Sequence, residues 1–179
     1  VREGIVTGPV IINALSGISG AGRKNKTNLL YVERTDNVNA YAPGRTHRHW
    51  YEIRDQIRQQ GGLGLDSILF TPHLVPVRQG MICTTTATVA GRVTEDRIRE
   101  CLEEAYRDKP FVRIGGIPET RHVRWSNRCD IGVQFEGEHV LLFSAIDNLL
   151  KGASGQAVQN MNIRFGFEET AGLRVWGDY

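Results

Sequence analysis

The sequence predicts an α+β domain built on a mixed, largely antiparallel sheet with helices on one face. Residues 130–135 and 139–145 are two β-rich segments joined by Glu136-Gly137-Glu138, which is the pattern of an antiparallel hairpin. Residues 94–107 place apolar side chains at helical spacing, as expected of a helix that covers a sheet. No repeat, low-complexity tract or linker divides the 179 residues, so we expect one domain over residues 1–179.

The remaining elements follow from local patterns along the chain. Proline lacks a backbone N–H and fixes φ, so Thr71-Pro72 should end the strand before it. Thr94, followed by two acidic residues, is a good N-cap for the next helix. Residues 25–39 are polar and should be mostly loop. The predicted strands are 10–15, 67–70, 81–89, 130–135 and 139–145, with short extended pieces at 111–114 and 121–125, and the predicted helices are 52–60, 94–107 and 157–165.

Composition limits the class of protein. The net charge of +2 is too small to favour nucleic acid or an anionic membrane as a partner. The longest apolar run, at residues 140–143, is too short to cross a bilayer, and no secretory signal pattern opens the chain. We therefore expect a cytoplasmic protein. The three cysteines, Cys83, Cys101 and Cys129, fit a reducing compartment, and each occurs where a small core residue would.

Residues 41–52 concentrate the ionisable groups of the chain. Pro43-Gly44 signals a turn, and a helical pattern follows, so we expect His47 and His49 on a short extended piece, facing the same side. Arg48 then points to the other side. Imidazoles titrate near neutral pH, so two of them beside a carboxylate suit proton transfer. A solvated basic loop would have the same spacing.

Two other segments suit an anionic ligand. Residues 16–24 are rich in Gly and Ser, and their backbone N–H groups can surround an anion while Arg23 binds phosphate or carboxylate. Their glycine spacing is not that of the dinucleotide fingerprint. Residues 147–157 lead into the last helix, and small residues, free N–H groups and Lys151 there favour an anionic or amide-bearing ligand. A flexible turn and tight helix-to-sheet packing are the structural alternatives.

Five strings occur in a characteristic order: residues 16–23, His47-Arg48-His49, residues 70–76, residues 127–131, and residues 145–152 with 156–160. Together they resemble the C-terminal catalytic and dimerisation region of the N-acetyl-gamma-glutamyl-phosphate reductase family of arginine biosynthesis. The resemblance implies the fold of the C-terminal domain of glyceraldehyde-3-phosphate and semialdehyde dehydrogenases. It also implies an uncovered sheet face that pairs with a second subunit, in a homodimer or homotetramer.

The resemblance implies an NADP-dependent oxidoreductase that converts N-acetyl-gamma-glutamyl phosphate to N-acetylglutamate semialdehyde through a cysteine thioester. His49 would be the catalytic acid/base, although the two histidines can be assigned the other way. The nicotinamide end of NADPH would face Asn148, Lys151 and Gly152. The implied substrate-binding residues are Ser16, Ser19, Gly20, Arg23, Tyr41, His47, Arg48 and Glu52.

The chain departs from the family pattern in one respect. The family's nucleophile lies in a Gly-Cys-Tyr-Pro-type motif upstream of the matched region, and the dinucleotide fold lies earlier still. Neither is in these residues, which begin with Val1, and none of the three cysteines has those flanks. We therefore expect a substrate-binding and dimerisation domain without the NADP-binding domain, which alone is inactive and binds NADPH weakly.

Other interpretations remain open. The carrier-protein-linked aminoadipate phosphate reductase of lysine biosynthesis is similar over the same motifs. A metal-dependent hydrolase would use His47 and His49, with His73 or His122 and Glu52, because His-x-His is a common half-site. No third ligand has convincing local spacing, so we expect no metal. For the fragment alone, a non-catalytic dimerisation module is a further reading.

Overall fold

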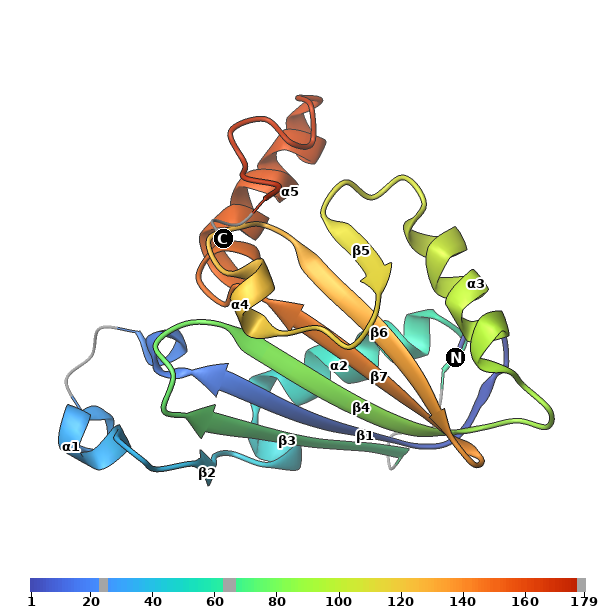
Figure 1. The fold of residues 1–179 in the computed structure, drawn as a ribbon, viewed down its shortest axis with the longest axis horizontal. Helices are drawn as coiled ribbons and strands as arrows, with labels where there is room; N and C mark the ends of the chain where they lie inside the picture. The colour runs from blue at the N-terminus through green and yellow to red at the C-terminus, as the bar shows by residue number, and fades with distance from the viewer. Residues whose placement is uncertain (23–25, 63–66, 177–179) are drawn as a thin grey trace.

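The computed structural model describes residues 1–22, 26–62 and 67–176, and their centre is one seven-stranded sheet (Figure 1). The strand order is β2-β3-β1-β4-β7-β6-β5. Only the β1–β3 and β5–β6 pairs among these strands are parallel, so the prediction of a mixed, largely antiparallel sheet is confirmed. The strands are β1 (Val6–Gly17), β2 (Asn39–Ala40), β3 (Ile68–Val75), β4 (Met81–Val89), β5 (Val112–Gly115), β6 (Cys129–Glu136) and β7 (His139–Ile146).

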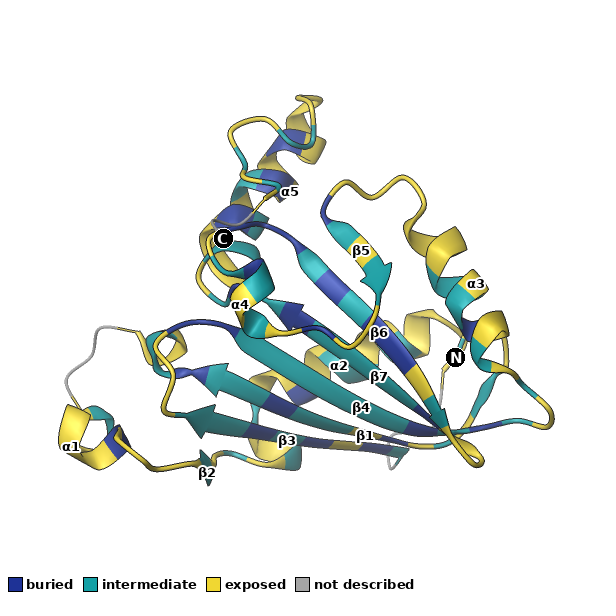
Figure 2. Cartoon of the chain, viewed as in Figure 1, coloured by how far each residue is buried: buried dark blue, intermediate teal, exposed yellow. Residues whose placement is uncertain are grey.

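Two long helices, α2 (Arg48–Gln59) and α3 (Glu95–Tyr106), cover the same face of the sheet. The buried anchor of α2 is Trp50, and that of α3 is Ile98. The sheet residues beneath them are register partners or lie two apart on a strand, so their side chains share one face. The buried sheet residues are Ala14, Ile68 and Phe70 under α2, and Val10, Ala87, Val89, Val133 and Val140 under α3 (Figure 2).

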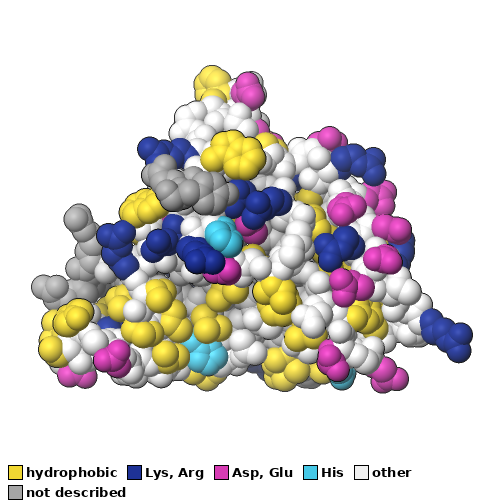
Figure 3. Space-filling model, viewed as in Figure 1, with side chains coloured by type: hydrophobic (Ala, Val, Ile, Leu, Met, Phe, Trp, Pro, Cys, Tyr) yellow, Lys and Arg dark blue, Asp and Glu magenta, His cyan; other side chains and the backbone are white. Residues whose placement is uncertain are grey.

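The opposite face is open over β1, β3 and β4. Ile11 and Leu69 point to this face and are 36% and 52% exposed. In Figure 3, which views the molecule from this side, hydrophobic side chains gather over these strands. The one-turn helix α4 (Thr120–Val123) contacts β7 on this side (Figure 1). The predicted uncovered face is therefore present.

The strand predicted at residues 67–70 does not end at Thr71-Pro72, so this prediction is wrong. β3 continues through Pro72 to Val75, and Pro72 pairs with Ala14 of β1. The carbonyl of Pro72 accepts the N–H of Tyr41, which follows β2. The nitrogen of Pro72 therefore also faces the side of β3 on which β2 lies. β2 pairs with His73 and Leu74 only, so the pairing ends beside the residue that lacks an N–H, and the bond from Tyr41 to Pro72 has no reciprocal partner.

The predicted extended piece at 121–125 is also wrong, because Thr120–Val123 forms α4. One helical turn buries Val123 completely, and tertiary packing outweighs local propensity in so short a segment. The helix after Thr94 is confirmed: Thr94 Oγ1 accepts the N–H of Arg97 at 3.2 Å. The hairpin around Gly137 is confirmed, with β6 and β7 paired from Glu136↔His139 onward.

The last helix is α5 (Gly155–Phe165), which projects away from the sheet (Figure 1). A π-helical turn, η5 (Leu150–Ser154), leads into it, and Gly166 ends it in the left-handed conformation, as predicted. Within the described residues, no helix has the length and apolar character needed to span a bilayer. The short elements are η1 (Ile18–Ala21), η2 (Thr27–Leu29), α1 (Tyr31–Arg34) and η3 (Gly44–Thr46).

Candidate functional site

The Gly- and Ser-rich segment after β1 folds as the 3-10 turn η1 and is bonded to the loop before β4. The N–H of Gly17 donates to Gly80 O, that of Ile18 to Val77 O, and that of Ser19 to Arg78 O, at 2.9, 2.9 and 3.1 Å. These three N–H groups are therefore used within the protein and are not free for the predicted anion. Arg23, the predicted anion-binding cation of this segment, lies outside the described residues.

Asn148 joins η1 to the start of β4. Its Nδ2 donates to Ser19 Oγ at 3.0 Å, and its Oδ1 accepts the N–H of Gly80 at 2.7 Å. A Cβ on Gly20 would lie 3.1 Å from Ser16 Oγ and 3.4 Å from Asn148 Nδ2, so glycine permits this close approach. We call Ser16, Ser19, Gly20 and Asn148 the amide cluster. The sequence analysis assigned Ser16, Ser19 and Gly20 to the substrate and Asn148 to the cofactor, and the structure brings these four residues together.

The entrance to the last helix differs from the prediction of free N–H donors. Asp147 Oδ1 accepts the N–H groups of Leu149 and Leu150, and its carbonyl accepts that of Gly152. These donors are therefore used by the chain itself. Gly152 is exposed beside the amide cluster, where its Cβ position lies 3.8 Å from Asn148 Cβ.

Lys151 points along α5. Its Nζ donates to Gln159 Oε1 at 2.6 Å and lies 5.3 Å from the centre of the Phe111 ring. Burial lowers the pKa of Lys151, an effect that Cys129 and Glu169 oppose. The ammonium group is thus engaged with α5. Of the three predicted cofactor residues, Asn148 belongs to the amide cluster, Gly152 borders it, and Lys151 points away from it.

The histidine segment begins α2 and is not extended. His47 is the N-cap of the helix, and its Nδ1 accepts the N–H of His49 at 3.1 Å. The ring centres of His47 and His49 are 4.7 Å apart, and Tyr41 and Phe70 lie 5.6 and 5.3 Å from His47. We call Tyr41, His47, His49 and Phe70 the histidine cluster. The predicted extended piece fails because an imidazole nitrogen replaces the usual hydroxyl or carboxylate cap.

The electrostatics of the histidine cluster favour a neutral imidazole at His47. Burial lowers the pKa of His47, the charges of His49 and Arg48 lower it further, and Glu52 opposes them. Because Nδ1 accepts a hydrogen bond, the neutral ring carries its hydrogen on Nε2. Burial also raises the pKa of Tyr41. Arg48, His49 and Glu52 are exposed, so an exposed imidazole with adjacent charged groups is available for proton transfer.

The two clusters lie along the same pair of strands. Phe70 is paired with Ile12, whereas Ser16 lies four residues farther along β1 and points to the same face. At the rise of an extended strand this separates the clusters by about 13 Å. Among the described residues, no hydrogen bond or ring contact joins them. They occupy one face of the sheet without forming a single closed pocket.

Two of the three cysteines are affected by burial. Burial raises the pKa of Cys83 to about 11 and that of Cys129 to about 11, so both are poor nucleophiles at neutral pH. Cys83, Cys101 and Cys129 are all free. Over the described parts of the chain, no three His, Cys, Asp or Glu side chains are grouped so that they could bind a metal ion.

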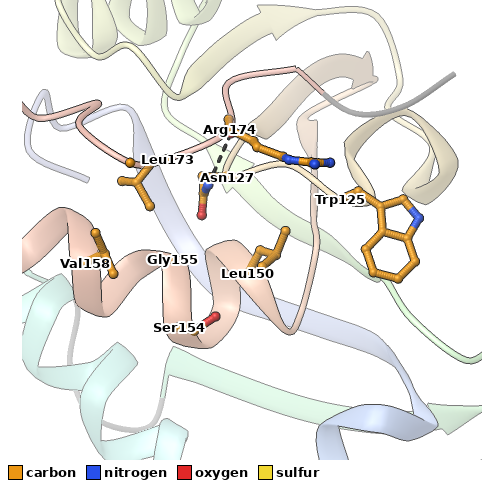
Figure 4. A pocket seen from close by; sticks show the side chains of 9 residues that line it. Trp125, Asn127, Leu150, Ser154, Gly155, Val158, Leu173 and Arg174 are labelled. Atoms are coloured by element: carbon orange, nitrogen blue, oxygen red, sulfur yellow. Dashed lines mark hydrogen bonds between the residues drawn. The ribbon is translucent and has the colours of Figure 1, made fainter.

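A hollow of about 470 Å³ lies between the segment before β6, the start of α5 and the C-terminal tail (Figure 4). Asn127 borders it and donates to the carbonyl of Arg174 at 3.2 Å. Sequence reasoning did not single out this hollow, since its walls come from three separate segments. It is lined by Trp125, Asn127, Leu150, Ser154, Gly155, Val158, Gly172, Leu173 and Arg174.

Sequence reasoning also missed the role of Asp147, which is fully buried beside Asn148. Its neighbours Gln79 and Trp125 come from distant loops, and both donate to its Oδ2 at 2.7 Å. The available signal was an aspartate just before a helix, which is a common N-cap position.

Comparison with known proteins identifies the family of this chain. A family model described as "Semialdehyde dehydrogenase, dimerisation domain" matches residues 1–148. The chain belongs to this family. The match covers all seven strands and every residue of the amide and histidine clusters, and it confirms the resemblance inferred from the sequence motifs.

Relatives of this semialdehyde dehydrogenase dimerisation domain include proteins named N-acetyl-gamma-glutamyl-phosphate reductase. The protein of Geobacter metallireducens is 46% identical over 169 residues, which are 92% of this chain and 49% of the relative. That of Rhodopirellula baltica is 41% identical over 180 residues, covering 97% of this chain and 51% of the relative. The chain thus spans about half the length of the curated relatives that it matches.

Solved structures share the fold of this semialdehyde dehydrogenase domain. Aspartate semialdehyde dehydrogenase II from Vibrio cholerae, complexed with ASA, superposes with a TM-score of 0.66 at 14% identity. The superposition covers 93% of this chain and 57% of that protein. At such low identity the likeness concerns the fold, and it confirms the predicted fold class.

Proposed function

We propose that this chain is the substrate-binding and dimerisation part of an NADP-dependent reductase. The complete enzyme converts N-acetyl-gamma-glutamyl phosphate to N-acetylglutamate semialdehyde in arginine biosynthesis, through a cysteine thioester. The observation that carries this proposal is the 46% identity, over 92% of the chain, to a protein of that name. The thiol comes from a part of the longer protein outside these residues, since the raised pKa values of Cys83 and Cys129 make both poor nucleophiles.

His49 is our candidate for the acid/base. It is exposed at the first turn of α2, whereas the Nδ1 of its neighbour His47 is already occupied by the helix cap. An exposed imidazole can reach a thiol or an alkoxide supplied from outside the domain. His47 then orients His49, and Tyr41, Arg48 and Glu52 contact the substrate around it.

Ser16, Ser19 and Gly20 form the other wall of the substrate site, with Arg23 as a phosphate or carboxylate contact. Asn148 fits a ligand amide: one hydrogen on Nδ2 and one lone pair on Oδ1 remain after its bonds to Ser19 and Gly80. NADPH supplies a hydride when it is bound. In this chain Asn148 and Gly152 would border its nicotinamide end, with Lys151 behind them, and the remaining contacts come from an NADP-binding domain of the longer protein.

The open face of the sheet is the proposed contact with a second copy of the chain. Ile11 and Leu69 are exposed there, and the family is described as a dimerisation domain. A self-complementary face of this kind gives a homodimer, and two such contacts give a homotetramer. We expect the assembled enzyme to work in the cytoplasm, without nucleic-acid or membrane partners.

The test is a kinetic assay of the longer protein that carries this chain. NADPH oxidation is measured with N-acetyl-gamma-glutamyl phosphate and, separately, with carrier-linked aminoadipyl phosphate. We expect turnover of the first substrate and none by the 179-residue chain alone. His49→Gln should lower kcat by about 10²- to 10⁴-fold, and His139→Gln on the distant hairpin is the matched control. Turnover of only the aminoadipyl substrate would reassign the pathway, and full activity of His49→Gln would refute the proposed acid/base.

A further inference from the structure

Asp147 is a fully buried carboxylate whose four hydrogen-bond donors come from three segments of the chain. Oδ1 accepts the N–H groups of Leu149 and Leu150 at 2.8 and 3.0 Å. Oδ2 accepts Gln79 Nε2 and the N–H of Trp125, both at 2.7 Å. All four donors are neutral N–H groups, and two of them lie at the start of a helix, where its dipole favours negative charge.

Asp147 and Gln79 also determine the position of the amide cluster. Gln79 bonds to the side chain of Asp147, and the next residue, Gly80, bonds through its N–H to the side chain of Asn148. Two consecutive residues before β4 are thus paired with two consecutive residues after β7. Ser19 is bonded to the same Asn148 amide. The bond from Gln79 to Asp147 is therefore adjacent in sequence, at both ends, to the bond from Gly80 that holds this amide.

Trp125, in the third segment bonded to Asp147, has an unusual backbone conformation. Trp125 has a φ of 63°, which a bulky side chain seldom adopts. Its N–H donates to Asp147 Oδ2, and its half-exposed indole lies 5.3 Å from the guanidinium carbon of Arg78. Such a conformation persists only where the surroundings impose it, and it is commonest at functional sites. The Asp147 carboxylate supplies one of the bonds that impose it.

We propose that Asp147 is a positioning residue for the amide cluster. Its carboxylate joins the loops at Gln79, Trp125 and Leu149 and so fixes the Asn148 amide against Ser19, without contacting substrate or cofactor itself. The effect on turnover rests on the proposed reductase function. The bonding role does not, because it follows from the contacts within this chain.

Two variants separate this role from a general loss of stability. Asp147→Asn keeps the shape of the side chain but replaces one acceptor oxygen by an NH₂ group. Each carboxylate oxygen accepts at least one backbone N–H, so either amide orientation places the NH₂ against a backbone N–H group. Gln79→Met removes one donor and leaves the carboxylate intact. The matched control is Val140→Ala, a buried core truncation under α3, away from the amide cluster.

The experiment uses the longer protein that carries this chain and measures kinetics, melting temperature and hydrogen–deuterium exchange. We expect Asp147→Asn to lower kcat at least tenfold and Gln79→Met about threefold, whereas Val140→Ala keeps kcat within twofold at a similar melting temperature. Exchange over residues 122–128 and 147–152 should be at least tenfold faster in Asp147→Asn than in Val140→Ala.

Hydrogen–deuterium exchange in Asp147→Asn that is no faster than in the unmodified protein would overturn the positioning role. The same conclusion would follow if Val140→Ala, at the same melting temperature, lost as much kcat as Asp147→Asn. If Asp147→Asn does not fold, Gln79→Met decides through the same comparison. If the unmodified protein reduces neither acyl phosphate, the proposed function fails, and the exchange comparison alone then decides the role of Asp147.

Discussion

Gly155, the first residue of α5, has no space for a larger side chain. A Cβ there would lie 1.6 Å from Asn127 Oδ1 and 2.9 Å from Leu150 O, distances that real Cβ atoms essentially never show. Asn127 is buried, and its Nδ2 donates to Arg174 O at 3.2 Å, so the amide moves aside only by losing that bond. We therefore predict that Gly155→Ala lowers the free energy of unfolding, although alanine favours helices.

The size of the effect follows from three terms. Overpacking costs about 1–3 kcal/mol, and loss of the Asn127 hydrogen bond costs about 1 kcal/mol. Alanine in place of glycine within a helix recovers about 1 kcal/mol. The expected net loss is about 1–3 kcal/mol, which for a domain of this size lowers the melting temperature by roughly 2–12 °C.

Thermal and urea unfolding followed by circular dichroism measure this loss. Gly152→Ala is the matched control, because its Cβ would meet only Ile146 Cδ1 at 3.4 Å and softer contacts beyond. We expect that control to keep or raise the stability, by up to about 1 kcal/mol. Equal melting temperatures for the two variants would refute the steric argument.

Three further predictions concern groups outside the start of α5. Because folding lowers the pKa of His47, the unfolded chain binds more protons than the folded chain at mildly acidic pH. The stability that the neutral ring contributes is therefore complete above the ordinary histidine pKa of 6.5 and is lost as the pH falls below it. His47→Asn keeps a capping side chain that does not titrate, so its urea midpoint should fall less than that of the unmodified protein between pH 7 and pH 5. Thr94→Ala should lower the free energy of unfolding by about 1 kcal/mol by removing the N-cap of α3, whereas Thr94→Ser should not, as urea unfolding will measure. Cys83 and Cys129, with pKa values raised to about 11 from 9.0, should be alkylated by iodoacetamide at pH 8 far more slowly in the folded protein than in urea, and mass spectrometry of the modified peptides that finds equal rates would contradict this.

The parts of the fold that the sequence predicts well are set by residues close together in the chain. A glycine between two apolar runs fixes the β6–β7 hairpin, and Thr94 fixes the start of α3. The continuation of β3 through Pro72 depends instead on β1, and the turn of α4 depends on burial of Val123. Both are tertiary effects, which no local pattern in the chain contains.

The candidate site divides in the same way. His47 and His49 are neighbours, so sequence alone indicates that they share a site, but not that one caps the helix of the other. Ser19 and Asn148 are 129 residues apart, and only the family resemblance brought them together before the structure did. Asp147 was missed because its partners Gln79 and Trp125 lie 68 and 22 residues away, where no motif connects them.

The two clusters differ in the polar groups that remain for a ligand. In the amide cluster, Asn148 and the backbone around Ser19 are largely bonded to the protein itself, so this wall offers few free donors. In the histidine cluster, His49 is exposed, and the exposed Arg48 and Glu52 lie beside it. Under the proposed function, His49 at the start of α2 carries the proton transfer, and Asp147 holds the wall that shapes the site. Substitutions at His49 should accordingly change the pH dependence of kcat, whereas those at Asp147 should lower kcat at every pH, because in the proposed mechanism only His49 exchanges protons with the reacting atoms.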